Sequence, residues 1–204
     1  MKPIERTLIL LKQMFKDEPR FIMGRYGRNG WATCTFNTPL TSKEIDSHFL
    51  KDTFSLPRDY KHFLTLHNGC GLFETESDLI LELFPLEEML EMSEEHHSED
   101  GLLSEGNYWI IGQIDEKWIL IDKNQCTDTE DSFKKPYITI VHPSDGLDTA
   151  VTLNLNFECF LERAIIAQGD YFWEWSEDTE LTVTYGDVLT YEEIDETLYL
   201  EDKK

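Results

Sequence analysis

The spacing of apolar and polar residues along the chain predicts short helices separated by strands. Apolar residues recur every three or four positions from Ile4 to Phe15, which predicts a first helix there. Thr41 followed by Glu44 is a capping-box pattern, in which each side chain satisfies a backbone N–H of the other residue. A second helix is therefore expected from that point, with Ile45 and Phe49 turned toward the core.

The stretch from Phe54 to Gly71 carries the strongest helical pattern. Pro57 suits a first helical turn, because its missing N–H would be unpaired there in any case. One face of this helix is expected to enter the core, and it comprises Tyr60, Phe63, Leu64 and His67. The remaining positions are expected elsewhere, namely Arg58, Asp59, Lys61 and His62. The Asn68-Gly69 pair predicts the stop, with Gly69 and Gly71 at positive φ.

Runs of aromatic and β-branched residues predict a sheet. The clearest signal is 108–123, where two such runs flank a polar turn at Asp115-Glu116 and indicate an antiparallel hairpin. Further strands are expected at 31–36, within 72–83, at 137–142 and at 150–155. The glycine-containing segment 24–30 lacks the preceding strand and following helix of a phosphate-binding loop, so we interpret it as a turn.

Two more helices are expected after the middle of the chain. One is expected within 84–92, where the helix starts after Pro85. The other covers 157–168, with Asn156 as N-cap and Gly169 at C′. In the tail, 181–188 resembles a hairpin and Thr190 opens a last helix. Because strands and helices do not alternate strictly, the predicted fold class is α+β, with a central, mostly antiparallel sheet flanked by helices.

A sequence signature of the form L-P-x-x-Y-x-x-F-L-x-x-x-N-G resembles that of the SUKH superfamily. It is carried by Leu56, Pro57, Tyr60, Phe63, Leu64, Asn68 and Gly69. The resemblance covers about residues 41–168 and implies a SUKH-like α+β fold. It leaves 1–40 as a helix-and-loop extension and 169–204 as an acidic, aromatic elaboration that we expect to pack on the same domain. The superfamily includes fungal cell-wall-synthesis regulators and many bacterial immunity proteins.

The chain is strongly acidic, with 41 Asp and Glu residues against 18 Lys and Arg and a formal net charge of −23. Such a field repels nucleic acid and anionic membranes and accelerates encounter with a basic protein. The alternative interpretation is that the acidity serves only solubility. No apolar run approaches the roughly 18 residues of a membrane span. The segment MKPIERTL does not resemble a secretory signal, so a cytoplasmic location is expected.

Candidate chemistry is sparse. The cysteines are scattered, without a C-x-x-C pair, which favours reduced thiols over a disulfide framework or a zinc site; they are Cys34, Cys70, Cys126 and Cys159. His96 and His97 are adjacent on what we interpret as a solvated loop, where their rings would diverge rather than converge on a metal. No nucleophile with a base, converging carboxylate pair or cofactor cradle is evident. We therefore expect a non-enzymatic protein without metal or cofactor.

The resemblance implies a protein that binds a toxin domain directly and neutralises it. Many toxins of that class are nucleases with a positive cleft, which an acidic inhibitor would complement. The alternative hypothesis is a scaffold or regulator of the cell-wall-regulator type. Two candidate contact sets are Glu87, Glu88 and Glu91, and Trp173, Glu174 and Trp175. An equally open interpretation places the first set on a solvated face and the second in the core. The sequence names neither the toxin nor the oligomeric state.

Overall fold

The computed structural model describes residues 2–23, 29–49, 55–76, 79–97, 103, 107–126 and 136–175. It divides the chain into two compact units, Met1–Phe172 and Trp173–Lys204, and all of the elements below belong to the first. Three predicted features lie outside the described residues: most of the 24–30 turn, the 181–188 hairpin and the helix opened by Thr190. The packing of 169–204 on the same domain stays a prediction.

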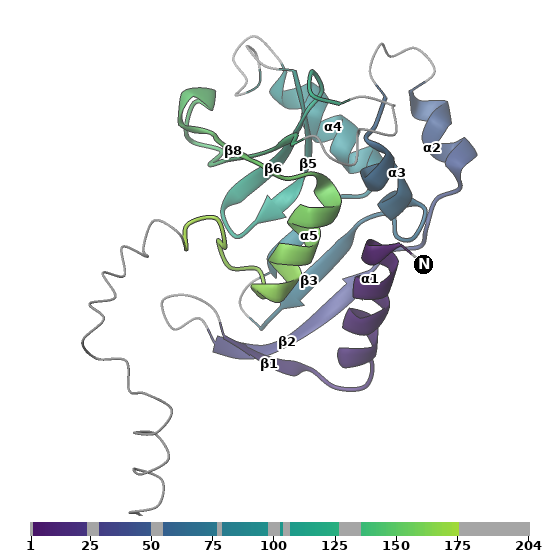
Figure 1. Ribbon diagram of the computed structural model, residues 1–204, viewed down its shortest axis with the longest axis vertical. Coiled ribbons are helices and arrows are strands. Elements are labelled where there is room, and N and C mark those ends of the chain that lie inside the picture. Colours follow the sequence, from purple (N-terminus) through teal and green to yellow (C-terminus); the bar gives the residue numbers. More distant parts are fainter. Residues whose placement is uncertain are drawn as a thin grey trace, which may run out of the picture. The chain divides into compact units, whose positions relative to one another are not determined.

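The described residues form one antiparallel sheet in which every strand pairs with its neighbours in the sequence (Figure 1). This meander confirms the predicted α+β class and the antiparallel sheet. It also places segment 1–40 in the same sheet, because two of its strands stand at one edge. The strands are β1 (Arg20–Met23), β2 (Asn29–Phe36), β3 (Cys70–Glu74), β4 (Leu79–Leu83), β5 (Tyr108–Ile114), β6 (Lys117–Asp122), β7 (Ile138–Val141) and β8 (Val151–Leu153).

The helices are α1 (Pro3–Met14), α2 (Ser42–His48), α3 (Arg58–Leu64), α4 (Leu86–His96) and α5 (Phe157–Ile166), with a 3-10 turn η3 (Leu147–Thr149). Figure 1 shows α1 and α5 side by side over one face of the sheet, and two hydrogen bonds join them. Thr41 and Glu44 form the expected capping box at α2, and the hairpin turns at Asp115-Glu116 as predicted. Asn29 and Gly30, expected in a turn, belong to β2.

The core is centred on α3. Tyr60, Phe63 and Leu64 are 0% exposed, as the helical spacing predicted. The Phe157 ring of α5 lies 4.9 Å from the Tyr60 ring and 5.2 Å from the Phe63 ring, between centroids. A large apolar side chain contributes about 1.5–3 kcal/mol when fully buried, so this aromatic cluster holds α3 and α5 together.

Asp59 differs from the prediction, because its side chain is only 3% exposed. The reason is a cap built between distant elements. Asp59 Oδ2 accepts the Glu158 N–H at 3.1 Å, and Asp59 Oδ1 accepts the Tyr137 hydroxyl. The Tyr137 Oη accepts the Phe157 N–H at 2.9 Å, and Asn156 Oδ1 accepts the next free N–H of the helix. The first three N–H groups of α5 therefore all have partners.

The Asn68-Gly69 pair also differs in part. Helix α3 ends at Leu64, before this pair, and Gly71 lies inside β3 without positive φ. Gly69 does have φ +86°, and a Cβ there would lie 2.6 Å from the Leu83 carbonyl oxygen. Asn68 Oδ1 accepts the Leu86 N–H at 2.8 Å, which supplies the cap that α4 lacks in its own sequence. The pair therefore ends the loop that follows α3, and its Asn68 caps the start of α4.

Two further expectations need correction. His96 and His97 are not on a loop, because α4 continues to His96, whose ring lies 4.4 Å from the Trp118 ring, and His97 is the C-cap. At α5, the C′ residue is Gln168 rather than Gly169: Gln168 has φ +55°, and the N–H groups of the two residues bond back to the helix as a Schellman motif. Gly169 is one position later, also at positive φ.

Candidate interaction surface

Helix α4 carries the first predicted contact set. Glu87, Glu88 and Glu91 are all exposed, and the helix begins shortly after β4. Glu87 Oε2 receives a long hydrogen bond of 3.4 Å from Asn68 Nδ2, so this glutamate stands beside the α4 cap. The three carboxylates lie within one and a half turns of one helix, and whether a partner uses them stays a prediction.

The second predicted set is Trp173, Glu174 and Trp175, which belong to the second unit of the chain. Trp175 is exposed, whereas Trp173 and Glu174 are half-buried. The structure does not place this unit relative to the first. The structure therefore does not bring this set together with the α4 glutamates, and its role in binding stays a prediction.

The described residues contain an exposed aromatic surface that sequence reasoning missed. In the β1–β2 ribbon, Phe21 pairs with Trp31, and their ring centroids are 5.8 Å apart. Phe21 is 54%, Met23 72% and Trp31 66% exposed, while the alternate residues Ile22 and Ala32 are buried. Since side chains alternate across a strand, the three large apolar residues share the outer face, opposite the buried face.

A hollow of about 560 Å³ lies next to Trp31. Its lining includes Thr33, Glu74 and Glu76. Thr33 and Glu74 are paired residues of the neighbouring strands β2 and β3. The hollow thus places an exposed indole beside two carboxylates. We call the surface made by Phe21, Met23, Trp31, Thr33, Glu74 and Glu76 the Trp31 face.

Carboxylates continue from the Trp31 face across the sheet to α4. Burial first, and then the negative charges of Glu88 and Glu74, raise the pKa of the Glu82 carboxyl above its usual range. Glu82 lies on β4, and its carboxylate receives a hydrogen bond of 2.9 Å from Gln113 Nε2 of the neighbouring strand β5. We call Glu74, Glu82 and Glu88 the acidic row. It connects one predicted contact residue, Glu88, to the surface that was missed.

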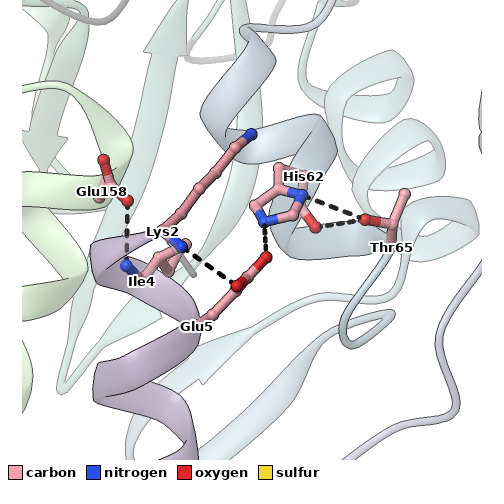
Figure 2. Close-up of polar contacts among 6 residues, drawn as sticks. All are labelled: Lys2, Ile4, Glu5, His62, Thr65 and Glu158. Atoms are coloured by element: carbon pink, nitrogen blue, oxygen red, sulfur yellow. Dashed lines mark hydrogen bonds and ion pairs between the residues drawn. The ribbon is translucent and has the colours of Figure 1, made fainter.

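A separate polar cluster joins α1, α3 and α5 (Figure 2). Glu158 of α5 accepts the Ile4 N–H of α1 at 3.0 Å, and Glu5 of α1 lies 3.0 Å from His62 Nε2 of α3. The Lys2 N–H, together with His62, lowers the pKa of the Glu5 carboxyl. With Asp59 capping α5, the three helices are linked in a ring by carboxylates.

The same cluster places a carboxylate, an imidazole and a hydroxyl in sequence, as Glu5, His62 and Thr65. The contact between Thr65 Oγ1 and His62 Nδ1 is 3.5 Å, which is long for a hydrogen bond. The hydroxyl instead donates to the His62 carbonyl oxygen at 2.7 Å, so its single proton is already used (Figure 2). This geometry suits helix attachment better than activation of a nucleophile.

A sequence profile of the SMI1 / KNR4 family (SUKH-1) matches residues 39–163, well over half of the chain. The chain belongs to the SUKH-1 family. Among curated proteins it is similar to YobM, an uncharacterized protein of Bacillus subtilis (strain 168), with 38% identity over 141 residues that cover 66% of this chain and 70% of YobM. It is also similar to YnaB of the same organism, with 27% identity over 143 residues that cover 70% of this chain and 88% of YnaB.

In this SUKH-1 chain the signature residues are structural. Leu56 and Pro57 are buried where the chain enters α3, and the three apolar positions of α3 form the centre of the core. Asn68 and Gly69 then connect β3 to the start of α4 through the side-chain cap and the close backbone approach. The family signature therefore explains the fold, and the candidate contact residues lie outside it.

The four cysteines are free thiols in different surroundings, and burial is the main cause that raises the pKa of each. Cys70 is buried, whereas Cys159 on α5 is exposed. Within the described ranges, no three His, Cys, Asp or Glu side chains are grouped as metal ligands. No helix in that part of the chain is both long enough and apolar enough to cross a membrane.

Proposed function

We propose that this SUKH-1 protein is an immunity protein that neutralises a cognate toxin by direct binding, without chemistry of its own. The observation that supports this most is the display of carboxylates on α4 and across the acidic row, in a chain of net charge −23. Family membership also supports this role.

The partner in this proposal is a basic toxin domain, most simply a nuclease. An enzyme that grips phosphate presents a cationic cleft, and an acidic protein that covers the cleft gains fast association and charge complementarity. The same charge disfavours nucleic acid and anionic membrane as partners. A cytoplasmic site of action belongs to the proposal, because nucleic acid targets lie there.

The proposal is tested by affinity capture on the purified protein from lysate of its source cells, followed by a salt step and mass spectrometry. We expect a basic polypeptide that arrests growth when expressed alone in a test host and loses this effect when co-expressed with the present chain. Because steering between charges is screened by salt, the captured complex should associate more slowly at high ionic strength.

Two outcomes would contradict the proposal. Capture of envelope or signalling proteins without a growth-inhibiting one would favour the scaffold or regulatory alternative instead. Saturable turnover of a substrate, abolished by one substitution, would show an enzyme. In either case the fold and the family would stand unchanged.

A further inference from the structure

The Trp31 face combines exposed apolar side chains with neighbouring carboxylates. Three large apolar side chains are exposed together, and two of them are aromatic rings in edge contact. Exposed apolar groups that cluster next to polar ones mark interaction sites more often than scattered apolar residues do. On α4, by comparison, the exposed glutamates follow one another without an exposed large apolar residue between them.

Addition of a partner strand to the edge of the sheet is a less suitable binding mode than contact with the Trp31 face. β1 is the edge strand, and an open edge can accept an additional strand from a partner. The Met23 N–H, however, donates to Gln168 Oε1 at 2.9 Å. Since Gln168, just after the end of α5, already accepts that N–H, the exposed side chains of the Trp31 face are the more accessible contact.

Charge decides which occupant fits. A second copy of this chain would bring the same carboxylates against the acidic row and Glu76, so like charges would repel. Residues 173–204 are a poor occupant for the same reason, because acidic residues outnumber basic ones there. Nucleic acid would present phosphates. A protein segment that carries arginine or lysine is complementary to the row, and the stems of such side chains also cover apolar surface.

We propose that the Trp31 face and the acidic row form the docking surface for an arginine- and lysine-bearing segment of a basic partner protein. In this arrangement Trp31 and Phe21 pack against cationic side chains, and Glu74 and Glu76 pair with their charged ends in the hollow. The aromatic anchors supply most of the affinity, while Glu82 and Glu88 extend the charge match toward α4. This assignment rests on the proposed function, because it names the surface by which a basic toxin would be held.

The surface is tested first without any toxin. The probe is N-acetyl-hexa-arginine amide, titrated into the ¹⁵N-labelled full chain and followed by NMR. We expect the largest shifts at the Trp31 indole N–H and at the amides of 29–33 and 74–76. The variant E74Q/E76Q should weaken peptide binding about tenfold. The matched control D145N/D148N also removes two exposed carboxylates, between β7 and β8 at the opposite edge of the sheet, and should change peptide binding less than twofold.

Two results would overturn the assignment. One is that the largest shifts fall on α4 or on 173–175. The other concerns Arg25 and Arg28, which lie outside the described residues. A tenfold gain in peptide affinity for R25A/R28A would show that the chain's own arginines compete with the peptide for this surface.

A second measurement uses the toxin obtained by capture. W31A and E74Q/E76Q should each weaken its binding at least tenfold and reduce protection of cells, with melting temperatures unchanged because these side chains are exposed. W31F should retain much of the binding. If the wild-type chain neutralises a toxin but these variants bind it equally well, the surface is wrong and the function stands. If no toxin is found while the peptide still maps to Trp31, the function is wrong and the cationic docking surface stands.

Discussion

Replacement of Asp59 by alanine should destabilise the protein more than any other loss of a single carboxylate from the described residues. Asp59 is buried and accepts three hydrogen bonds, from the N–H groups of Tyr60 and Glu158 and from the Tyr137 hydroxyl. A buried donor left without a partner costs about 1–3 kcal/mol. Two of these donors, on Glu158 and Tyr137, come from other elements, so we expect D59A to lose about 3–5 kcal/mol of unfolding free energy.

The assay is urea denaturation followed by circular dichroism, with the slope m checked between variants. D59N keeps the shape and one acceptor oxygen, so it should lose less, about 1–3 kcal/mol. Asp17 is exposed in a bend, and D17A is the matched control, expected within about 0.5 kcal/mol of wild type. Should D59A fail to fold, D59N still reports on the cap.

A double-mutant cycle tests the mechanism. Y137F removes the hydroxyl that bonds both Asp59 and the Phe157 N–H. If the three groups act as one cap, D59N and Y137F together should cost less than the sum of the single changes, by about 0.5–3 kcal/mol. Strict additivity, or a D59A loss below about 1 kcal/mol, would refute the reasoning that Asp59 holds the start of α5.

Three other predictions follow from single positions. Gly69→Ala should lower the melting temperature by several degrees, since it combines positive φ with a Cβ only 2.6 Å from a backbone oxygen, whereas unchanged thermal stability would contradict the geometry. Burial lowers the pKa of His67 below 6.5, so the stability that neutral His67 contributes is complete above pH 6.5 and is lost as the pH falls toward the lowered pKa of the folded state. H67Q should therefore flatten the dependence of stability on pH between pH 7 and 5. A profile identical to that of the wild type would contradict this role of His67. In the native protein Cys159 should react with a thiol reagent well before buried Cys70, which peptide mapping after brief labelling would reveal, and the opposite order would show that the helix is turned differently.

Local signals made much of the fold predictable. The capping box at Thr41, the N-cap at Asn156 and the core face of α3 depend on residues three or four positions apart, so the sequence alone contains the whole interaction. The hairpin at Asp115-Glu116 is equally local. For these elements the structure agrees with the expectation because no distant partner is needed.

Long-range contacts account for what was missed. Asp59 caps a helix 99 positions away, and a polar residue in a helical pattern gives no sign of such a partner. β1 has only four residues, too few for a clear alternation of exposed and buried positions. Trp31 was expected in a strand, but which face it occupies depends on the side that α1 and α5 cover, and that is a property of the assembled fold.

The acidic composition therefore combines two different uses of the carboxylate. Glu5, Asp59 and Glu158 are occupied in joining helices, where their removal should cost stability. Glu74 and Glu88 are displayed around exposed surface, where neutralisation should leave the fold intact. Net charge cannot separate the two groups, because it counts them equally. Only the second group can set the rate and choice of a basic partner, so a charge variant tests binding cleanly when it changes displayed carboxylates and spares those that hold the helices.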